Sequence, residues 1–430
     1  MRVKKPATPT SQLRWLIPGM GLKRWLLLLV LGASILGLGL IYSLVVLYRS
    51  GFLPLWLYRA LTLQFLPTGM RAVLAVCAGL LVIGGAAYGL SRSVISPFME
   101  TKGAALADVV YEYRRRERGP RIVAIGGGTG LATLLRGLKR HTHHLTAIVT
   151  VADDGGSSGR VRRELGLPPP GDFRNCIAAL ADDEALTTQL WQYRFGFTAD
   201  GAQDPATDLA GHSFGNLFIA AMAGITGSFE TALEQSSRVL AIQGRILPST
   251  LANVTLVAEV REQQVRRVTG ESHIPQSQGA VGRVYLTPEN APAYPEAVRA
   301  ILTADLVVLG PGSLYTSLIP NLLIRGIREA LSSTRAPVVF VCNVANQPGE
   351  TNGYATDDYL KALERHIGRG VVDVMLVNSA MPQEDTERPV RSAEHTGAGQ
   401  TQVVEMDLVD WQKTRMHDSA KLAKAVLAQL

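Results

Sequence analysis

Two long apolar segments without a charge limit what this chain can fold into. Residues 25–48 read WLLLLVLGASILGLGLIYSLVVLY, and residues 72–91 read AVLAVCAGLLVIGGAAYGLS. An apolar helix of about 20 residues can cross the hydrocarbon core of a bilayer. A signal peptide has a shorter apolar region and no second span. The length and purity of both segments also disfavour a pair of buried core helices. We therefore predict a two-helix transmembrane hairpin.

The basic residues around these segments predict an orientation. Residues 1–99 contain ten Lys or Arg and no Asp or Glu. Six of the ten lie before residue 25, whereas the loop 49–71 carries Arg49, Arg59 and Arg71. A further basic cluster follows within 92–121. The positive-inside rule places both ends of the hairpin in the cytoplasm.

The predicted location is thus the inner (cytoplasmic) membrane, multi-pass, with both termini and the C-terminal domain in the cytoplasm. The predicted parts are a basic N-terminus (1–24), two spans (25–48 and 72–91), a short external or interfacial loop (49–71), a linker (92–120) and a domain (121–430). The spans contain no ionisable residue, so they indicate an anchor and no transport path. The linker reads as a solvated helix with a weak added affinity for anionic headgroups.

The rest of the chain has a different composition. Residues 100–430 hold 33 basic and 36 acidic residues, so this part has no basic surface that would indicate nucleic-acid binding. The three cysteines, Cys77, Cys176 and Cys342, lie far apart with no CxxC, which disfavours a structural zinc site or a disulfide framework. His141, His143 and His144 follow Lys139-Arg140 at a helix end, where cationic groups are favoured, so metal binding there is disfavoured.

From Arg121 onward the pattern alternates between buried strands and helices. Apolar, β-branched runs at 121–125, 145–152, 305–310, 337–344 and 371–378 are typical of parallel strands. We expect helices at 131–140, 321–332 and 357–367, a mainly helical region at 172–242, and short strands at 245–287. This alternation predicts an α/β fold, a Rossmann-like, doubly wound and mostly parallel sheet.

The first strand runs directly into Gly126, Gly127, Gly128, Thr129 and Gly130. A glycine turn between a strand and a helix lets a ligand approach the backbone, and the helix N-terminus favours a phosphate. The run is neither G-x-G-x-x-G nor a Walker motif. By itself it is also compatible with a tight turn that binds nothing.

The second strand is followed by ADDGGSSGR. Asp153 and Asp154 stand where acidic groups of such sheets bind ribose hydroxyls or a metal, and both could hold Mg²⁺ through oxygen ligands. A donor-rich loop follows. We predict that it also contacts the nucleotide, through Gly155, Gly156, Ser157 and Ser158.

Two helix starts carry further candidates. In GDFRNC, Asp172 is a plausible helix cap, and Arg174 and Asn175 follow in the first turn. An arginine there opposes the helix dipole, which favours a ligand anion as its partner. In GHSFGN, Ser213 is a plausible cap, Asn216 is a candidate ligand contact, and His212 is either a structural histidine or a catalytic one.

A second glycine turn, Gly310, Pro311, Gly312 and Ser313, follows the strand at 305–310. It is a second backbone cradle of the same physical kind. Ser313 does not read as a hydrolase nucleophile, because G-x-S-x-G is absent. Tyr315 could stack on a base or sugar, or pack in the core.

Together these stretches resemble one family. In order, GGGTG, VTVADDGGSSGR, GDFRNC, GHSFGN, LPSTLANVTLVAE, GPGSLYTSLIPNLL and CNVANQPGET are similar to those of the YvcK-like gluconeogenesis factors, relatives of the CofD-like 2-phospho-L-lactate transferases. The resemblance covers 121–430, whereas the hairpin lies outside it. It implies a Rossmann-like protein that binds UDP-sugars such as UDP-N-acetylglucosamine and acts in carbon metabolism, cell-wall growth and cell shape.

The resemblance also implies roles for residues. The two glycine turns would hold nucleotide phosphates, and Asp153, Asp154 and Asn216 match positions of the superfamily. Arg415 stands in Arg415-Met416-His417-Asp418, one residue further from His-Asp than is usual in this branch.

Three hypotheses follow. The first is a membrane-tethered, non-catalytic regulator that binds a UDP-sugar, with a homo-oligomer left open. The second is a CofD-like transferase, Mg²⁺-dependent, that moves a phospholactyl-type group from a nucleotide donor to a deazaflavin; its candidate catalytic residues are Asp153, Asp154 and His212. The third is a scaffold that binds no ligand.

Overall fold

The structure is a computed structural model and describes residues 22–52, 54–95, 106–181, 185–196, 209–277, 279–380, 390 and 401–430. Much of the predicted basic N-terminus, and residues 96–105 of the predicted linker, lie outside the described residues. The chain divides into two compact units, 1–114 and 115–430, which we describe separately.

The first unit consists of helices. α1 (Leu22–Arg49) and α3 (Thr68–Ile95) contain windows long and apolar enough to cross a membrane, at Val30–Arg49 and Thr68–Gly85. No residue of either window is buried, so neither window packs as the core helix of this structure. The short α2 (Leu55–Leu61) lies between them, and the rings of Tyr48 and Tyr58 stack with centroids 4.2 Å apart. α4 (Leu106–Glu117) leads into the second unit.

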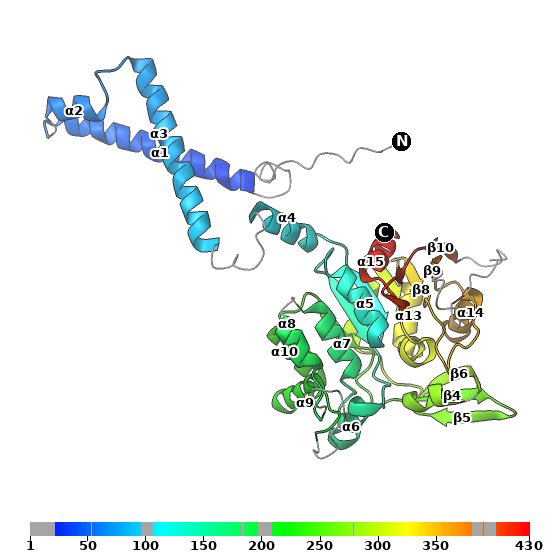
Figure 1. Ribbon diagram of the computed structural model, residues 1–430. Coiled ribbons are helices and arrows are strands. Elements are labelled where there is room, and N and C mark those ends of the chain that lie inside the picture. The colour runs from blue at the N-terminus through cyan, green and yellow to red at the C-terminus, as the bar shows by residue number, and fades with distance from the viewer. Residues whose placement is uncertain are drawn as a thin grey trace. The chain divides into compact units, whose positions relative to one another are not determined.

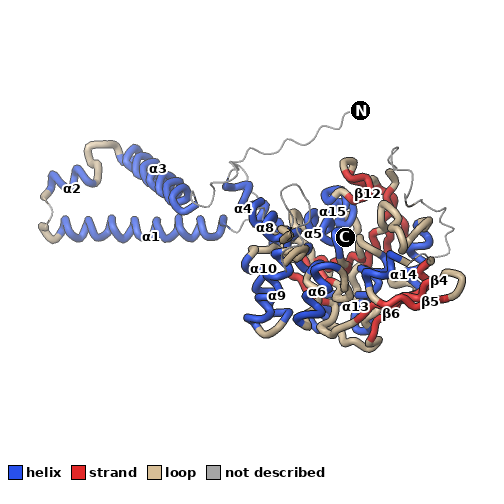
Figure 2. The backbone as a smooth tube through the Cα atoms, turned by 60° about the horizontal axis from the view of Figure 1, so that its bottom comes forward, coloured by secondary structure: helices blue, strands red, loops and turns tan. Residues whose placement is uncertain are grey.

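The second unit is built on a seven-stranded parallel sheet. Its strand order is β10-β9-β8-β7-β1-β2-β3, and every adjacent pair is parallel. The bounds are β1 (Ile122–Gly126), β2 (Leu145–Val149), β3 (Arg245–Pro248), β7 (Leu306–Leu309), β8 (Val338–Val341), β9 (Val374–Asn378) and β10 (Gln402–Met406). Figure 2 shows red strands in the interior of the unit, with blue helices around them. The predicted Rossmann-like α/β fold is confirmed.

The strand order reverses between β1 and β7. From β1 the chain passes through α5 (Gly128–Leu138) to β2, and from β7 it passes through α13 (Arg325–Ser333) to β8, in the opposite direction along the sheet. Because both crossovers are expected to be right-handed, their helices cover opposite faces. Ligands of open α/β sheets bind at such a reversal, outside the carboxyl ends of the strands.

The helices of the first face pack on one another. α5 contacts α7 (Gly171–Leu180) and α15 (Ser419–Leu427), and α7 also packs on β2 and β3. The other helices before β3 are α6 (Gly156–Leu165), α8 (Ala185–Gln192), α9 (Phe214–Thr226) and α10 (Phe229–Val239). The predicted helical region at 172–242 is therefore confirmed (Figure 1).

Beyond the main sheet, β4 (Thr255–Arg261), β5 (Val265–Thr269) and β6 (Ala280–Thr287) form an antiparallel sheet. Figure 1 shows it standing at one side of the unit. A 3₁₀ turn, Glu271–Gln276, joins β5 to β6. The remaining elements are α11 (Pro295–Leu302), α12 (Ile319–Leu322), α14 (Thr356–Ile367), β11 (Val409–Asp410) and β12 (Lys413–His417).

Some boundaries differ from the sequence prediction. The single helix expected at 321–332 is instead the end of α12 followed by α13, with Ile324 between them extended at ψ 115°. A π-turn (Leu314–Leu318) precedes α12. The side chain of Asn321 donates to the Ser317 carbonyl at 2.8 Å, and such bonds compete with the helical backbone. The second strand ends at Val149 and not at residue 152. Of the three residues that follow, Thr150 lines the candidate site, and Val151 and Ala152 lie in the hydrophobic core.

Candidate functional site

The two glycine turns meet at the reversal point of the sheet. They follow β1 and β7, which are hydrogen-bonded neighbours. A Cβ built on Gly130 would lie 2.5 Å from the carbonyl oxygen of Pro311, and one on Gly312 would lie 3.2 Å from the carbonyl oxygen of Gly127. The two turns approach so closely that Gly130 has no room for a side chain. Glycine is therefore needed where the two turns meet, which is also the place where a ligand would approach the backbone.

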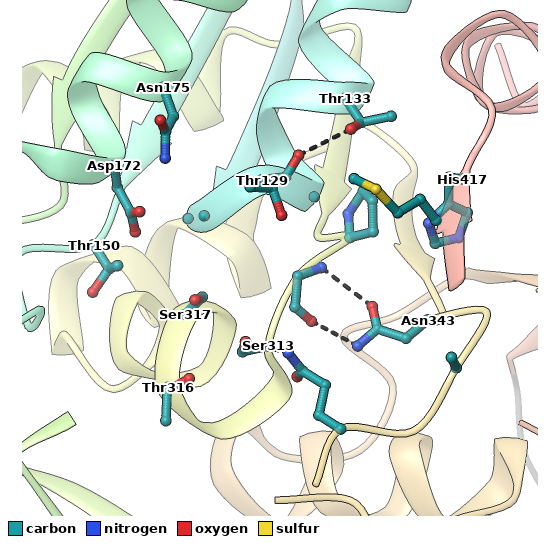
Figure 3. Close-up of a pocket in the computed structure, with 18 of the residues that line it drawn as sticks. Thr129, Thr133, Thr150, Asp172, Asn175, Ser313, Thr316, Ser317, Asn343 and His417 are labelled. Atoms are coloured by element: carbon teal, nitrogen blue, oxygen red, sulfur yellow. Dashed lines mark hydrogen bonds between the residues drawn. The ribbon is translucent and has the colours of Figure 1, made fainter. Parts of the chain in front are cut away.

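A cavity of about 410 Å³ opens between the turns. Figure 3 shows Asn175, Asp172 and Thr150 on one side of it, and Asn343 and His417 on the other. Its lining residues come from the segments that follow β1, β2, β7 and β8, from α7, from the 3₁₀ turn and from β12. They are Gly127, Gly128, Thr129, Gly130, Thr133, Thr150, Asp153, Asp172, Asn175, Glu271, Pro311, Gly312, Ser313, Thr316, Ser317, Asn343, Val344, Ala345, Gln347, Arg415, Met416 and His417.

Side-chain amides fix the second turn. Asn343 accepts from the Gly312 N–H at 3.3 Å and donates to the Gly312 carbonyl at 2.9 Å, the two dashed lines beside Asn343 in Figure 3. Gln347 donates to the Ser313 hydroxyl at 2.7 Å. The carbonyl oxygen of the Gln347 amide is buried and has no partner among the described residues. An acceptor without a partner thus lies buried beside a fixed backbone turn.

Hydrogen bonds to Glu350 and Asn321 fix the π-turn that follows Ser313. Glu350 is buried, and its carboxylate accepts from the Thr316 hydroxyl at 3.0 Å and from the Tyr315 N–H at 3.3 Å. Burial raises its pKa, while these two donors oppose the shift. Asn321 donates to the Gly126 carbonyl at 3.1 Å, which ties the π-turn region to the end of β1. Irregular helical turns of this kind are frequent at functional sites.

Three carboxyl groups line the cavity. Burial raises the pKa of Asp172 to about 7, with a further upward contribution from the charge of Asp153. Burial also raises the pKa of Glu271 to about 8, again with Asp153 and Asp172 adding to the shift. The pKa of Asp153 is raised by burial, which outweighs hydrogen bonds from the Gly155 N–H and Ser158. Like charges at close range disfavour joint ionisation, so this group of carboxyls retains protons into the neutral range.

Asp172 occupies the N-terminus of α5. Its carboxylate accepts from the Gly128 N–H, and a Cβ on Gly127 would lie 2.4 Å from one of its oxygens. The predicted capping of its own helix is wrong, because α7 begins at Gly171 with Pro170 as the cap residue. An internal carboxylate therefore already contacts the helix end at which the sequence predicts a ligand phosphate. The same helix end favours either anion.

About half of the residues predicted to contact a nucleotide line the cavity. They are Gly127, Gly128, Thr129, Gly130, Asp153, Asn175, Pro311, Gly312, Ser313 and Arg415. Gly126 and Gly310 lie just behind the turns, where a Cβ on Gly126 would be 3.7 Å from the Gly310 Cα. Gly155 and Gly156 begin α6 outside the lining.

Asp154 is turned away from its neighbour Asp153. Its carboxylate accepts from the Ser272 N–H at 2.9 Å and lies beside Gly270. It does not line the cavity, so the two aspartates do not face the same space. In the part of the chain that the structure describes, no group of three or more His, Cys, Asp or Glu side chains could hold a metal ion.

A second group of predicted residues forms a buried cluster at the start of α6 and α9. The Ser157 hydroxyl lies 3.2 Å from His212 Nδ1 and accepts from the Asn216 amide at 3.0 Å. Ser213 caps α9, as predicted. Burial lowers the pKa of His212. None of these side chains lines the cavity, and neither does Ser158, which bonds Asp153.

Arg174 and Tyr315 are both buried behind the cavity wall. The Arg174 guanidinium donates to Asn175 at 3.0 Å, but its Nε and Nη1 have no partner among the described residues. Burial lowers its pKa to about 10. Tyr315 packs in the core, and its hydroxyl lies 2.9 Å from that of Tyr354. Tyr315 therefore takes the core alternative and not the stacking one.

Several lining residues carried no individual signal in the sequence. Thr133 lies one helical turn after Thr129 and donates to its carbonyl at 3.0 Å. Glu271 comes from the 3₁₀ turn between β5 and β6, and Asn343 and Gln347 come from the loop after β8. His417 is buried, its Nε2 lies 3.1 Å from the Cys342 carbonyl, and burial lowers its pKa to about 4. Of these residues, only Thr133 could have been predicted from sequence spacing, because it lies four residues after Thr129 on the same face of a helix.

Known proteins match this chain closely. A relative from Nostoc is 44% identical over 96% of this chain and 91% of its own length. The gluconeogenesis factor of Bacillus subtilis is 46% identical over 72% of this chain and 97% of its own length. The model of the family described as 2-phospho-L-lactate transferase CofD matches residues 122–421. The chain belongs to the CofD family.

A solved structure agrees with this family membership. The crystal structure of a Bacillus halodurans protein superposes with a TM-score of 0.66 at 43% identity, covering 72% of this chain and all of the other. The Bacillus relatives thus match about the length of the second unit, whereas the Nostoc relative matches nearly the whole chain. The predicted relation to the YvcK-like gluconeogenesis factors is confirmed, since relatives at 40–46% identity carry that name.

Proposed function

We propose that this CofD-family protein binds a nucleotide sugar of the UDP-N-acetylglucosamine type and regulates carbon metabolism, cell-wall growth and cell shape. The observation that carries the proposal is the contact between two glycine turns at the reversal point of the sheet. Backbone N–H groups that follow two adjacent strands suit a diphosphate. The N–H groups of Gly128 and Gly312 are already bonded to Asp172 and Asn343, so the phosphates would contact other N–H groups of the turns. The name of the Bacillus subtilis relative supports a role in gluconeogenesis.

The cavity offers suitable contacts for the remainder of such a ligand. The side chains of Asn175, Thr133 and Gln347 line the cavity beside the turns, and each carries a donor and an acceptor. Its volume of about 410 Å³ lies within the usual range of about 300 to 1,000 Å³ for small-molecule sites. Protonation of Asp172 and Glu271 would reduce repulsion of the ligand phosphates. Nucleotide binding therefore fits the cavity despite its carboxyl groups.

Regulation is favoured over catalysis. Ser157 and His212 form a pair with the chemistry of a nucleophile and a base, but this pair lies outside the cavity lining. Cys342 is buried, and burial raises the pKa of its thiol far above the usual range, which disfavours the reactive thiolate. His417 lies in the lining but is held neutral by burial.

A transferase is the second candidate, because the family description and the cavity carboxyls favour it. Mg²⁺ in such enzymes is held by one or two carboxylates together with ligand phosphates. Asp153 faces the cavity and fits that role, whereas Asp154 does not. Turnover of a nucleotide-linked phospholactate donor with a deazaflavin and Mg²⁺ would support this candidate. No turnover above buffer would remove it.

We also propose that the protein is anchored in the inner membrane, with residues 115–430 in the cytoplasm. Two helices of sufficient length and the excess of Lys and Arg around them support the anchor. Protease added outside intact cells should leave the second unit whole. Its digestion would contradict the orientation.

The fragment 115–430 provides the first test, since it forms its own compact unit and matches Bacillus relatives that are covered almost entirely. Its melting temperature should rise with UDP-N-acetylglucosamine, because a ligand that binds only the folded state stabilises it. GDP and NAD serve as comparators. An unchanged melting temperature across a broad nucleotide panel would favour the scaffold hypothesis.

A further inference from the structure

A second cavity lies at the amino ends of the strands, opposite the glycine turns. It has a volume of about 270 Å³ and is lined by the first residues of three strands, β1, β2 and β3, and by α11. The glycine turns stand at the other ends of β1 and its neighbours. At about 3.3 Å per residue, the chain from Val123 in one lining to Gly127 in the other spans roughly 13 Å. A ligand in one cavity does not contact the other.

Three arginines from distant parts of the sequence line this second cavity. Arg121 precedes β1, Arg245 begins β3, and Arg299 lies on α11. Among the described residues that form the lining, Glu296 alone carries a carboxylate. Glu296 and Asp305, which pair with Arg245 and Arg121, offset two of the three guanidinium charges. The carbonyl end of α11 contributes roughly half a negative charge, so the cavity keeps a small positive excess that comes from Arg299.

Two of the arginines are held in place but keep unused donors. Arg121 donates to Asp305 through Nε and Nη2, at 3.3 and 2.9 Å, and Arg245 donates to Glu296 through Nη2 at 2.5 Å. Each guanidinium has five N–H donors, so both can bind a further anion. About 59% of each arginine side chain remains exposed. These ion pairs orient the donors without closing the cavity.

Arg299 is the third arginine that lines the second cavity. No side-chain hydrogen bond of Arg299 is found within the described residues, and its charge acts on the nearby Glu296. Guanidinium groups match phosphate oxygens in pairs of parallel hydrogen bonds. The volume exceeds that of a single phosphate ion and leaves space for a small attached group.

We propose that this second cavity binds a phosphate group carried by a small molecule, as a site separate from the glycine turns. The phosphate would bridge Arg121, Arg245 and Arg299. Its source is either a soluble phosphate ester or the headgroup of an anionic lipid. Arg116 and Glu117 lie at the rim of the cavity, because the carbonyl of Arg116 accepts from the N–H of His143 and the carbonyl of Glu117 lies 2.7 Å from His144 Nε2.

The test uses the full chain in nanodiscs. Hydrogen exchange of residues 295–303 is followed in neutral phosphatidylcholine discs with and without inorganic phosphate, and in discs that also contain phosphatidylglycerol. Protection by inorganic phosphate in neutral discs indicates a soluble source. Protection by phosphatidylglycerol without added phosphate indicates a lipid source. Absence of protection in both arms overturns the proposal.

Two variants make the test specific. Arg299→Gln should raise the half-saturating phosphate concentration by about tenfold, because it removes a charge-assisted contact. Arg266→Gln removes the same charge from the exposed strand β5 and should respond like the wild type. An equal response of both variants would also overturn the proposal. UDP-N-acetylglucosamine binding should not change in Arg299→Gln, so failure here is distinguishable from failure of the proposed function.

Discussion

Gly130→Ala is the substitution whose effect the geometry defines most closely. The added Cβ would lie 2.5 Å from the Pro311 carbonyl oxygen and 2.8 Å from its carbonyl carbon, where ordinary contact begins at 3.4 Å. Both atoms belong to the backbone of the second glycine turn, so the turns must separate by close to an ångström. Overpacking of this kind costs about 1 to 3 kcal/mol.

Gly224→Ala provides the matched control. Gly224 also lies in a helix, α9, but a Cβ there meets nothing within 4 Å. Alanine is favoured over glycine in a helix by at most about 1 kcal/mol, and this gain applies to both variants. The free energy of unfolding of Gly130→Ala should therefore fall about 1 to 3 kcal/mol below that of Gly224→Ala.

The assay is urea denaturation of the fragment 115–430, followed by circular dichroism, with the slope of each transition compared between variants. A lowered midpoint with an unchanged slope would show that stability itself has changed. Equal stability of the two variants, within about 0.5 kcal/mol, would refute the claim that the glycine turns touch.

Three further predictions concern the cavity. The pKa values of Asp172 and Glu271 are raised to about 7 and about 8, so the folded state binds more protons than the unfolded state. The free energy of unfolding should therefore fall as the pH rises from about 4 to about 8. Asp172→Asn should flatten this fall in pH-dependent denaturation, and an unchanged profile would count against the raised pKa. The affinity for an anionic nucleotide should also decline as the pH rises through about 7 to 8, because the ionised carboxyls repel phosphate. Titration calorimetry at several pH values measures this dependence, and an affinity that rises with pH would contradict the prediction. Asn343→Ala should weaken nucleotide binding by about tenfold, because it removes two hydrogen bonds to Gly312 that contribute about 0.5 to 1.5 kcal/mol each. Calorimetry measures this affinity, and an affinity equal to that of the wild type would show that the Asn343 amide does not hold the turn.

The sequence was sufficient for the framework of this fold. Apolar runs predicted the strands, and the glycine turns after β1 and β7 predicted where the site forms. This succeeded because the strands are buried on both faces, so their pattern is continuous and local. The relation between β1 and β7 follows from the topology of parallel sheets.

The site residues that could not be predicted from the sequence are brought to the cavity by tertiary contacts. Glu271 and Asn343 lie 118 and 190 residues after Asp153 in the chain, and no local pattern joins them. Asp153 and Asp154 are adjacent, yet one faces the cavity and the other binds the Ser272 backbone. Local spacing places a residue near a strand end but does not determine which way its side chain points.

The central claim is that the touching glycine turns bind a nucleotide sugar. Calorimetric titration of the fragment 115–430 with UDP-N-acetylglucosamine tests it most directly, with UDP, GDP and NAD as comparators and Gly312→Asp as the impaired variant. The account predicts selective binding of the UDP-sugar, weakened in Gly312→Asp by the added charge at the turn. Binding of GDP or a deazaflavin without binding of the UDP compounds would contradict the account and favour the transferase.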